Sequence, residues 1–128
     1  MAEGRPFRVL LVEDEPVIRE LVSSMLGDGT VDVQCAANGA EGLKLAKGAE
    51  YDLILLDVVL PQMDGITICR LLKADPKTAK TPLYMLTAKA KKADVETATK
   101  AGADGYIHKP FRASELMELI DRLRAKAT

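Results

Sequence analysis

Short apolar stretches alternate along the chain with longer segments in which apolar residues recur at helical spacing. The apolar stretches, which predict buried strands, are Phe7–Val12, Val31–Ala37, Tyr51–Asp57, Leu83–Thr87 and Gly105–His108. The helical segments are Glu15–Leu26, Asn38 to about Gly48, a third that starts after Asp64, about Lys91–Ala101, and Ser114 to about Lys126. Strands that alternate with helices in this way imply a parallel sheet covered on both faces. The expected fold class is therefore α/β, a doubly wound sheet of five strands with five helices.

Several helix ends carry recognisable signals. Pro16 falls in the first turn of the first helix, and Asn38 and Asp64 have the short polar side chains that cap helix starts. The "GDG" stretch at 27–29 should stop the first helix. On that helix we expect one apolar face to point inward, formed by Ile18, Leu21, Val22, Met25 and Leu26.

Length, charge and cysteine content argue against several classes of function. With 128 residues the chain suits one domain, 1–128, and the predicted elements leave no segment for a separate DNA-reading unit. A formal net charge of -1 gives no reason to expect direct binding of nucleic acid or of an anionic membrane. No apolar run approaches the roughly 20 residues that cross a bilayer. Cys35 and Cys69 are too few for a disulfide framework, so we expect small buried side chains and a cytoplasmic protein.

Chemically active side chains follow the predicted strands. They are Glu13 and Asp14 after the first strand, Asp57 at the end of the third, Thr87 at the end of the fourth and Lys109 after the fifth. In a doubly wound sheet, ligands bind outside the carboxyl ends of the strands, near the point where the strand order reverses. Each residue alone has an ordinary structural explanation, such as a helix cap or a solvated side chain. Together, at one edge of one sheet, they indicate a site.

These groups suggest a particular chemistry. Three carboxylates placed together repel one another unless a cation lies among them. Oxygen ligands with room for water suit Mg²⁺, or Mn²⁺ in its place, rather than zinc. Asp57 would then be the nucleophile that accepts a phosphoryl group, while the metal and Lys109 neutralise its oxygens and Thr87 donates a hydrogen bond to it.

Four motifs together resemble the receiver domain of bacterial two-component response regulators, and they extend over nearly the whole chain. They are "LLVEDEP" at Leu10–Pro16, "LLDVVLPQMDG" at Leu55–Gly65, "MLTA" at Met85–Ala88 and "AGADGYIHKPF" at Ala101–Phe111. The resemblance implies a flavodoxin-like fold with strand order 2-1-3-4-5. It also implies that Asp57 is the phosphoacceptor.

The resemblance extends to further residues. It implies that Glu13, Asp14, Asp57 and the backbone carbonyl of Val59 serve the metal site, with Asp14 and Asp57 acting most directly. Thr87 and Tyr106 would form a switch pair, and the bond between Lys109 and Pro110 would be cis. The acidic pair here is Glu-Asp rather than Asp-Asp, so we expect Glu13 to act through a metal-bound water.

Rival functions fit the sequence less well. A flavin or nucleotide binder needs a Gly-rich or Ser/Thr-rich loop after the first strand, whereas this chain has "EDEPVIRE". A phosphatase with an aspartate nucleophile needs an acid/base residue nearby, and the residue two after Asp57 is Val59. We therefore expect a stand-alone signalling switch and not an enzyme. The alternative is an N-terminal receiver domain excised from a longer response regulator with a DNA-binding or enzymatic output domain.

The expected partners are proteins. A sensor histidine kinase or a phosphotransfer protein would supply the phosphoryl group. A downstream protein would bind the face made by the fourth helix, the fifth strand and the fifth helix, where Tyr106 lies.

Overall fold

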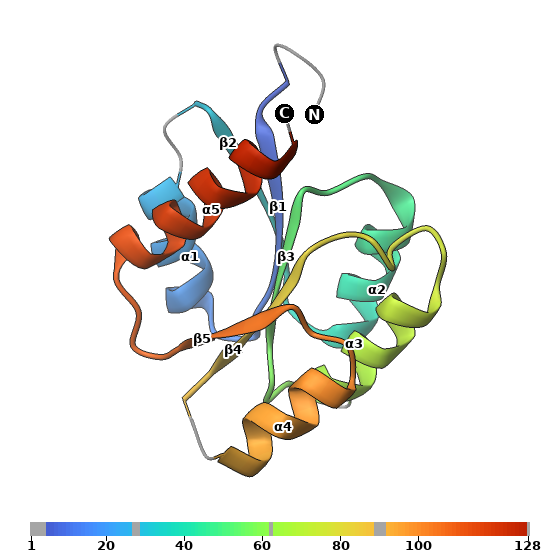
Figure 1. The fold of residues 1–128 in the computed structure, drawn as a ribbon. Coiled ribbons are helices and arrows are strands. Elements are labelled where there is room, and N and C mark those ends of the chain that lie inside the picture. Colours follow the sequence, from blue (N-terminus) through green and yellow to red (C-terminus); the bar gives the residue numbers. More distant parts are fainter. Residues whose placement is uncertain (1–4, 27–28, 62, 89–91, 128) are drawn as a thin grey trace.

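A parallel sheet lies between two layers of helices (Figure 1). The computed structural model describes residues 5–26, 29–61, 63–88 and 92–127, without the side chains of 92–95 and 127. The strands are β1 (Phe7–Val12), β2 (Val31–Ala36), β3 (Leu53–Asp57), β4 (Leu83–Thr87) and β5 (Gly105–His108). The helices are α1 (Pro16–Leu26), α2 (Gly39–Gly48), α3 (Gly65–Ala74), α4 (Lys92–Lys100) and α5 (Ala113–Ala127). The predicted α/β class is confirmed.

All neighbouring strands in the sheet run parallel, in the order β2-β1-β3-β4-β5. This is the order that the resemblance implied. The chain leaves β1 towards one edge of the sheet, to β2, and leaves β3 towards the other edge, to β4. The carboxyl ends of β1 and β3 therefore flank the topological switch point, at the lower end of the molecule in Figure 1.

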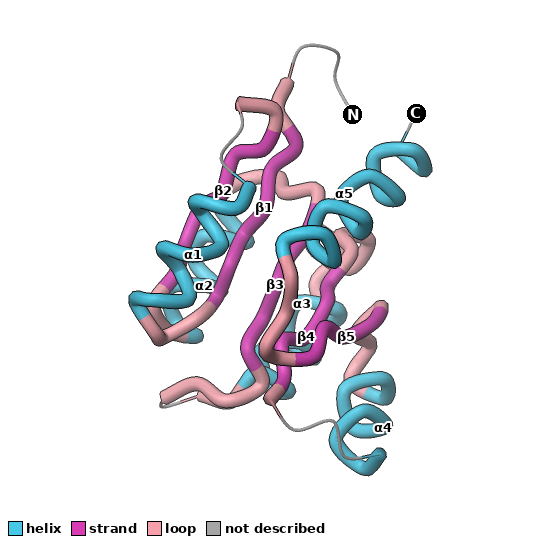
Figure 2. The backbone as a smooth tube through the Cα atoms, turned by 90° about the vertical axis from the view of Figure 1, so that its left-hand side faces the viewer, coloured by secondary structure: helices cyan, strands magenta, loops and turns pink. Residues whose placement is uncertain are grey.

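Each face of the sheet has its own apolar core, because alternate strand residues point to opposite sides. One core packs Leu10, Leu56 and Met85 against α2, α3 and the buried Ala98 of α4. The other packs Leu11, Leu55 and Leu86 against α1 and α5, which lie side by side over that face (Figure 2). β3, which contributes to both cores, is buried along its whole length. A strand buried on both faces can place a carboxylate only at its end.

Most predicted boundaries fall within a residue or two of the observed ones. Asn38 caps α2 by accepting a hydrogen bond from the Glu41 amide, and Asp64 caps α3 through the Thr67 amide. β3 starts at Leu53 rather than Tyr51. The carboxylate of Asp52 instead accepts hydrogen bonds from the Arg8 amide and the Arg5 guanidinium. Part of the predicted "GDG" stop, residues 27 and 28, lies outside the described residues, and Gly29 has a φ of 88°.

One predicted core position is wrong. Leu21 is 42% exposed, whereas Val22 and Leu26 are fully buried and Ile18 and Met25 are partly buried. Leu21 lies about 100° around the helix from Val22. The five apolar positions therefore occupy a wider part of the circumference of α1 than the sheet and α5 cover. Of the two cysteines, Cys69 is buried as expected and Cys35 is only partly buried.

Candidate functional site

Three carboxylates meet at the switch point between β1 and β3. Glu13, Asp14 and Asp57 each offer an oxygen, and these oxygens all lie within 4.8 Å of one another. Glu13 is fully buried and Asp57 is 6% exposed, whereas Asp14 faces solvent. The structure thus brings together the acidic residues that the sequence placed at these strand ends.

Lys109 joins this acidic cluster from the end of β5. Its Nζ donates to Glu13 Oε1 at 2.5 Å and to Asp57 Oδ2 at 3.0 Å. The Lys109 amide also donates to the Thr87 carbonyl, and the following bond to Pro110 is cis, as the resemblance implied. One ammonium group is therefore shared by two buried carboxylates, one in the loop after β1 and the other at the end of β3.

The electrostatics of the cluster favour a further cation. Burial raises the pKa of Glu13 from 4.5 to about 7; a hydrogen bond with Asp57 adds to the rise, and Lys109 opposes it. Burial alone would lower the pKa of Lys109, but its hydrogen bonds to Glu13 and Asp57 outweigh burial and raise it. One lysine therefore does not compensate the buried negative charge fully, and a divalent ion bound by the carboxylates would do so.

The donor atoms of the cluster fit Mg²⁺. They are carboxylate oxygens, and the exposed Asp14 leaves one side open to water ligands. The Val59 amide donates to Asp57 Oδ1 at 3.0 Å, so residue 59 lies beside the Asp57 carboxylate. Val59 is 71% exposed. The use of the Val59 carbonyl as a ligand stays a prediction.

Gly65 is a residue of the site that the sequence reasoning missed. A Cβ atom at this position would lie 2.1 Å from the carbonyl oxygen of Asp57, and the Gly65 amide donates to the Val58 carbonyl at 2.9 Å. The backbone after Asp57 can therefore fold back to the start of α3 only past a residue without a side chain. The signal in the sequence was the glycine directly after the helix cap Asp64.

Arg19 was also missed. It lies on α1, and its Nη1 donates to the backbone carbonyls of Glu13 and Asp14, at 2.9 Å each. The Glu13 amide in turn donates to the Ala36 carbonyl of β2. The loop that carries two of the three carboxylates is thus fastened to a helix and to a neighbouring strand. A basic residue shortly after the acidic pair was the only hint in the sequence.

The predicted switch pair lies on one face of the sheet. Thr87 is 6% exposed at the end of β4, and Tyr106, on β5, is 47% exposed. In the register of these strands Met85 pairs with Tyr106 and Thr87 with His108, so the tyrosine is diagonal to the threonine. Tyr106 therefore stands partly in water in this structure, on the α4 side of the sheet. The roles of both residues stay predictions.

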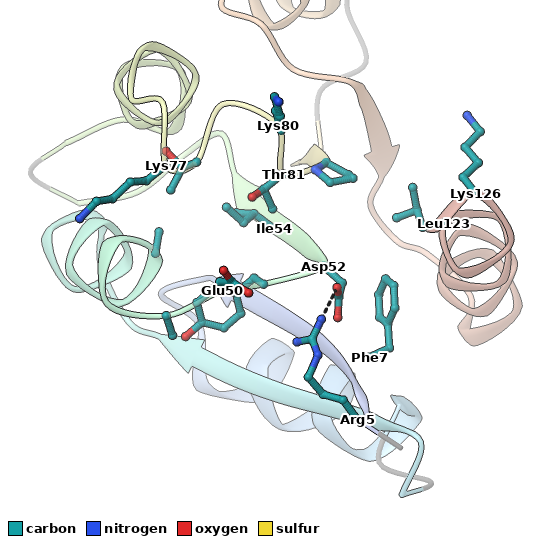
Figure 3. Close-up of a pocket in the computed structure, with 15 residues that line it drawn as sticks. Arg5, Phe7, Glu50, Asp52, Ile54, Lys77, Lys80, Thr81, Leu123 and Lys126 are labelled. Atoms are coloured by element: carbon teal, nitrogen blue, oxygen red, sulfur yellow. Dashed lines mark hydrogen bonds and ion pairs between the residues drawn. The ribbon is translucent and has the colours of Figure 1, made fainter. Parts of the chain in front are cut away.

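A cavity of about 430 Å³ lies at the opposite end of the strands (Figure 3). The Arg5–Asp52 ion pair crosses one side of it, at 2.9 Å. The side chains of Lys77, Lys80 and Lys126 extend away from its centre (Figure 3). The Arg5 and Asp52 side chains are thus paired with each other, and these three lysines are directed outward. The acidic cluster, by contrast, has the convergent groups of a functional site.

The strand order and the carboxylates at the switch point define a flavodoxin-like α/β protein with a candidate metal site. The chain matches the response regulator receiver domain family over residues 9–121, and it belongs to that family. Receiver domains of response regulators are signalling switches controlled by phosphorylation. Among the described residues, none of the helices combines the length and apolar character that a bilayer crossing requires.

Two curated relatives illustrate the similarity. RpaA of Synechocystis, a DNA-binding dual master transcriptional regulator, is 42% identical over 118 residues, which are 92% of this chain and 48% of that protein. The DNA-binding response regulator MtrA of Mycobacterium tuberculosis is 38% identical over 119 residues, 93% of this chain and 50% of MtrA. The chain therefore spans about half the length of these relatives.

Solved structures agree on the fold. The chemotaxis response regulator CheY4 of Vibrio cholerae is 32% identical with a TM-score of 0.86, over 92% of this chain and 98% of that one. The receiver domain of the sensor histidine kinase PA1611 from Pseudomonas aeruginosa is 34% identical with a TM-score of 0.85, over 92% and 97% of the two chains. That receiver domain holds a magnesium ion coordinated in its active-site cleft.

Proposed function

We propose that Asp57 is the phosphoacceptor of this receiver domain and that a sensor histidine kinase or a phosphotransfer protein supplies the phosphoryl group. The observation that carries the proposal is the shared lysine: Lys109 contacts Asp57 and Glu13, with the Asp14 carboxylate beside them. Two cationic groups, one of them the lysine and the other a metal, are what the transfer of a phosphoryl group to a carboxylate needs.

The placement of these groups supports the following step. A carboxylate oxygen of Asp57 attacks phosphorus, the bond from phosphorus to the donor's imidazole nitrogen breaks, and the electron pair stays on that nitrogen. Lys109 holds the Asp57 carboxylate through Oδ2, and the Val59 amide holds it through Oδ1. Mg²⁺, when bound, supplies charge neutralisation for the phosphoryl oxygens. Glu13 and Asp14 would bind the metal together with Asp57, and Mn²⁺ would fit the same oxygens.

The proposed output is a changed protein-binding surface. Once Asp57 is phosphorylated, Thr87 would donate its hydroxyl to a phosphoryl oxygen, and Tyr106 would move from its half-exposed position into the space beside Thr87. The face of α4, β5 and α5 would then differ between the two states. The chain would phosphorylate itself from a small phosphodonor and lose the group slowly. It would act in the cytoplasm and turn over no other substrate.

The second candidate is that the same domain is the N-terminal part of a longer response regulator. It is supported by the lengths of RpaA and MtrA, each about twice the part that this chain matches. In that case a DNA-binding or enzymatic output domain would receive the signal. The prediction that residues 1–128 themselves bind no nucleic acid belongs to both candidates.

Phosphorylation of the isolated chain tests the proposed function. Incubation with acetyl phosphate and Mg²⁺ should add one phosphoryl group, visible by intact-protein mass spectrometry, and Asp57→Asn should abolish it. Asp64→Asn is the matched control, because it neutralises a nearby carboxylate and leaves a good helix cap. It should label like the unaltered chain. Equal labelling of Asp57→Asn would reject the assignment.

A further inference from the structure

The Arg19 side chain contacts only backbone atoms of the loop after β1. Its Nη1 donates to the carbonyl oxygens of Glu13 and Asp14, both at 2.9 Å. Hydrogen bonds from a charged donor are about twice as strong as neutral ones. The two carbonyls belong to the peptide groups on either side of Asp14, so the contact fixes the backbone orientation before and after this residue.

Asp14 depends on this restraint more than its neighbours in the cluster do. Lys109 holds the side chains of Glu13 and Asp57, and the Glu15 and Val59 amides also donate to them. The Asp14 carboxylate faces solvent and, within the described part of the chain, makes no hydrogen bond or ion pair. Its position relative to the other two carboxylates is therefore set by the backbone that Arg19 restrains.

The charge of Arg19 acts in the opposite direction. A guanidinium near the cluster repels a divalent cation, because charges of the same sign repel one another even when they are partly solvated. If repulsion were its whole effect, removal of Arg19 would strengthen metal binding. If its hydrogen bonds set the position of Asp14, removal would weaken metal binding. The two effects have opposite signs, so one measurement separates them.

We propose that Arg19 is a positioning residue for the metal site. It contacts neither the metal nor the phosphoryl group, but holds the Asp14 carboxylate where Mg²⁺ can be shared with Asp57. The proposal rests on the metal site that is part of the proposed function. It predicts that this restraint raises the affinity for Mg²⁺ by more than the nearby positive charge lowers it.

The test is a calorimetric titration of Mg²⁺ into the unaltered chain and into Arg19→Met, which keeps an apolar stem but has no donor. We expect the dissociation constant to rise about tenfold, the lower end of the effect of removing groups that orient metal ligands. Arg112→Met is the matched control, since it removes one positive charge from an exposed residue after β5. It should bind Mg²⁺ as tightly as the unaltered chain or more tightly. Arg19→Lys should recover part of the lost affinity.

Phosphorylation by acetyl phosphate provides the second readout. Arg19→Met should be slow at low Mg²⁺ and approach the rate of the unaltered chain at saturating Mg²⁺, because the defect is in metal affinity. A rate that stays low at saturation would overturn the proposal. So would a dissociation constant that is unchanged or lower in Arg19→Met. Thermal unfolding of each variant shows whether it is folded at the temperature of titration, and Arg19→Gln replaces Arg19→Met if it is not.

The outcomes also separate this proposal from the proposed function. If the unaltered chain binds Mg²⁺ but takes up no phosphoryl group, the proposed function fails and the titrations still decide the role of Arg19. If the unaltered chain binds no Mg²⁺, the metal site and the role of Arg19 both fail.

Discussion

Glu13 is a residue of the site whose ionisation changes on folding. Its carboxyl group is fully buried, and burial together with Asp57 raises its pKa from 4.5 to about 7. A carboxyl with a raised pKa in the folded state binds its proton more tightly there than in the unfolded chain. In the metal-free protein the stabilising effect of that proton is complete below about pH 4.5 and is lost as the pH rises through 7.

We therefore expect metal-free protein to lose up to about 3 kcal/mol of stability through Glu13 between about pH 4.5 and pH 8. Urea unfolding at several pH values, with a chelator present, measures this loss. Glu13→Gln should lack it, so the difference between the two curves should decrease as the pH rises. Lys109 does not interfere, because its pKa is raised and its contribution falls only above pH 10.5. Parallel curves for the two proteins would contradict the prediction.

At the scale of elements, Lys73 links the end of α3 to the loop before β4 and to Asp104, the residue before β5. Its Nζ, at the end of α3, donates to the carbonyls of Ala79 and Thr81 and to the carboxylate of Asp104. The same Asp104 oxygen accepts a hydrogen bond from the Leu83 amide at 2.8 Å. This network fixes the starts of β4 and β5, the two strands that carry Thr87 and Tyr106.

Lys73→Met should destabilise the protein by about 1–3 kcal/mol, because it leaves partly buried acceptors without their donor. Lys44→Met, at an exposed position of α2, is the matched control and should change stability by less than about 0.5 kcal/mol. Chemical denaturation measures both. Amide exchange should also become faster at Leu83 and Asp104, whose amides bond across the network. Equal stability of the two variants would show that the network adds nothing.

At the scale of the whole molecule, the site and the proposed output surface lie on different parts of one sheet. Asp57 ends the central strand β3, whereas Tyr106 is on the edge strand β5, with β4 between them. A signal that travels from one to the other must cross β4. Thr87, buried at the end of β4, is the candidate for this coupling, because a ligand shifts populations only through a difference in affinity between states.

Thr87→Ala should accept a phosphoryl group at Asp57, but phosphorylation of this variant should not alter the face of α4, β5 and α5. In the unaltered chain we expect phosphorylation to alter amide exchange in α4, β5 and α5. In Thr87→Ala those changes should be absent while mass spectrometry still shows the phosphoryl group. Thr67→Ala, on the exposed side of α3, should behave like the unaltered chain. Exchange changes confined to α1 and α2 would rule out this route.

The sequence by itself determined the elements and most of the site. Strand positions follow from apolar runs such as Leu53–Leu56. A carboxylate that ends a strand buried on both faces lies where the carboxyl ends of the parallel strands meet. Once five such strands are parallel, their carboxyl ends share one edge, which is why Glu13, Asp57 and Lys109 could be placed together. The strand order came from the resemblance to a family and not from periodicity.

Only the tertiary structure decided what surrounds these groups. The exposure of Leu21, the close approach of Gly65 to the Asp57 carbonyl and the contact of Arg19 with two carbonyls all depend on the path of the backbone between elements. Periodicity reports which side of an element a residue occupies, but not how near another element comes. The burial that raises the pKa of Glu13 to about 7 is set by that packing, because desolvation depends on every neighbouring atom and not on local sequence.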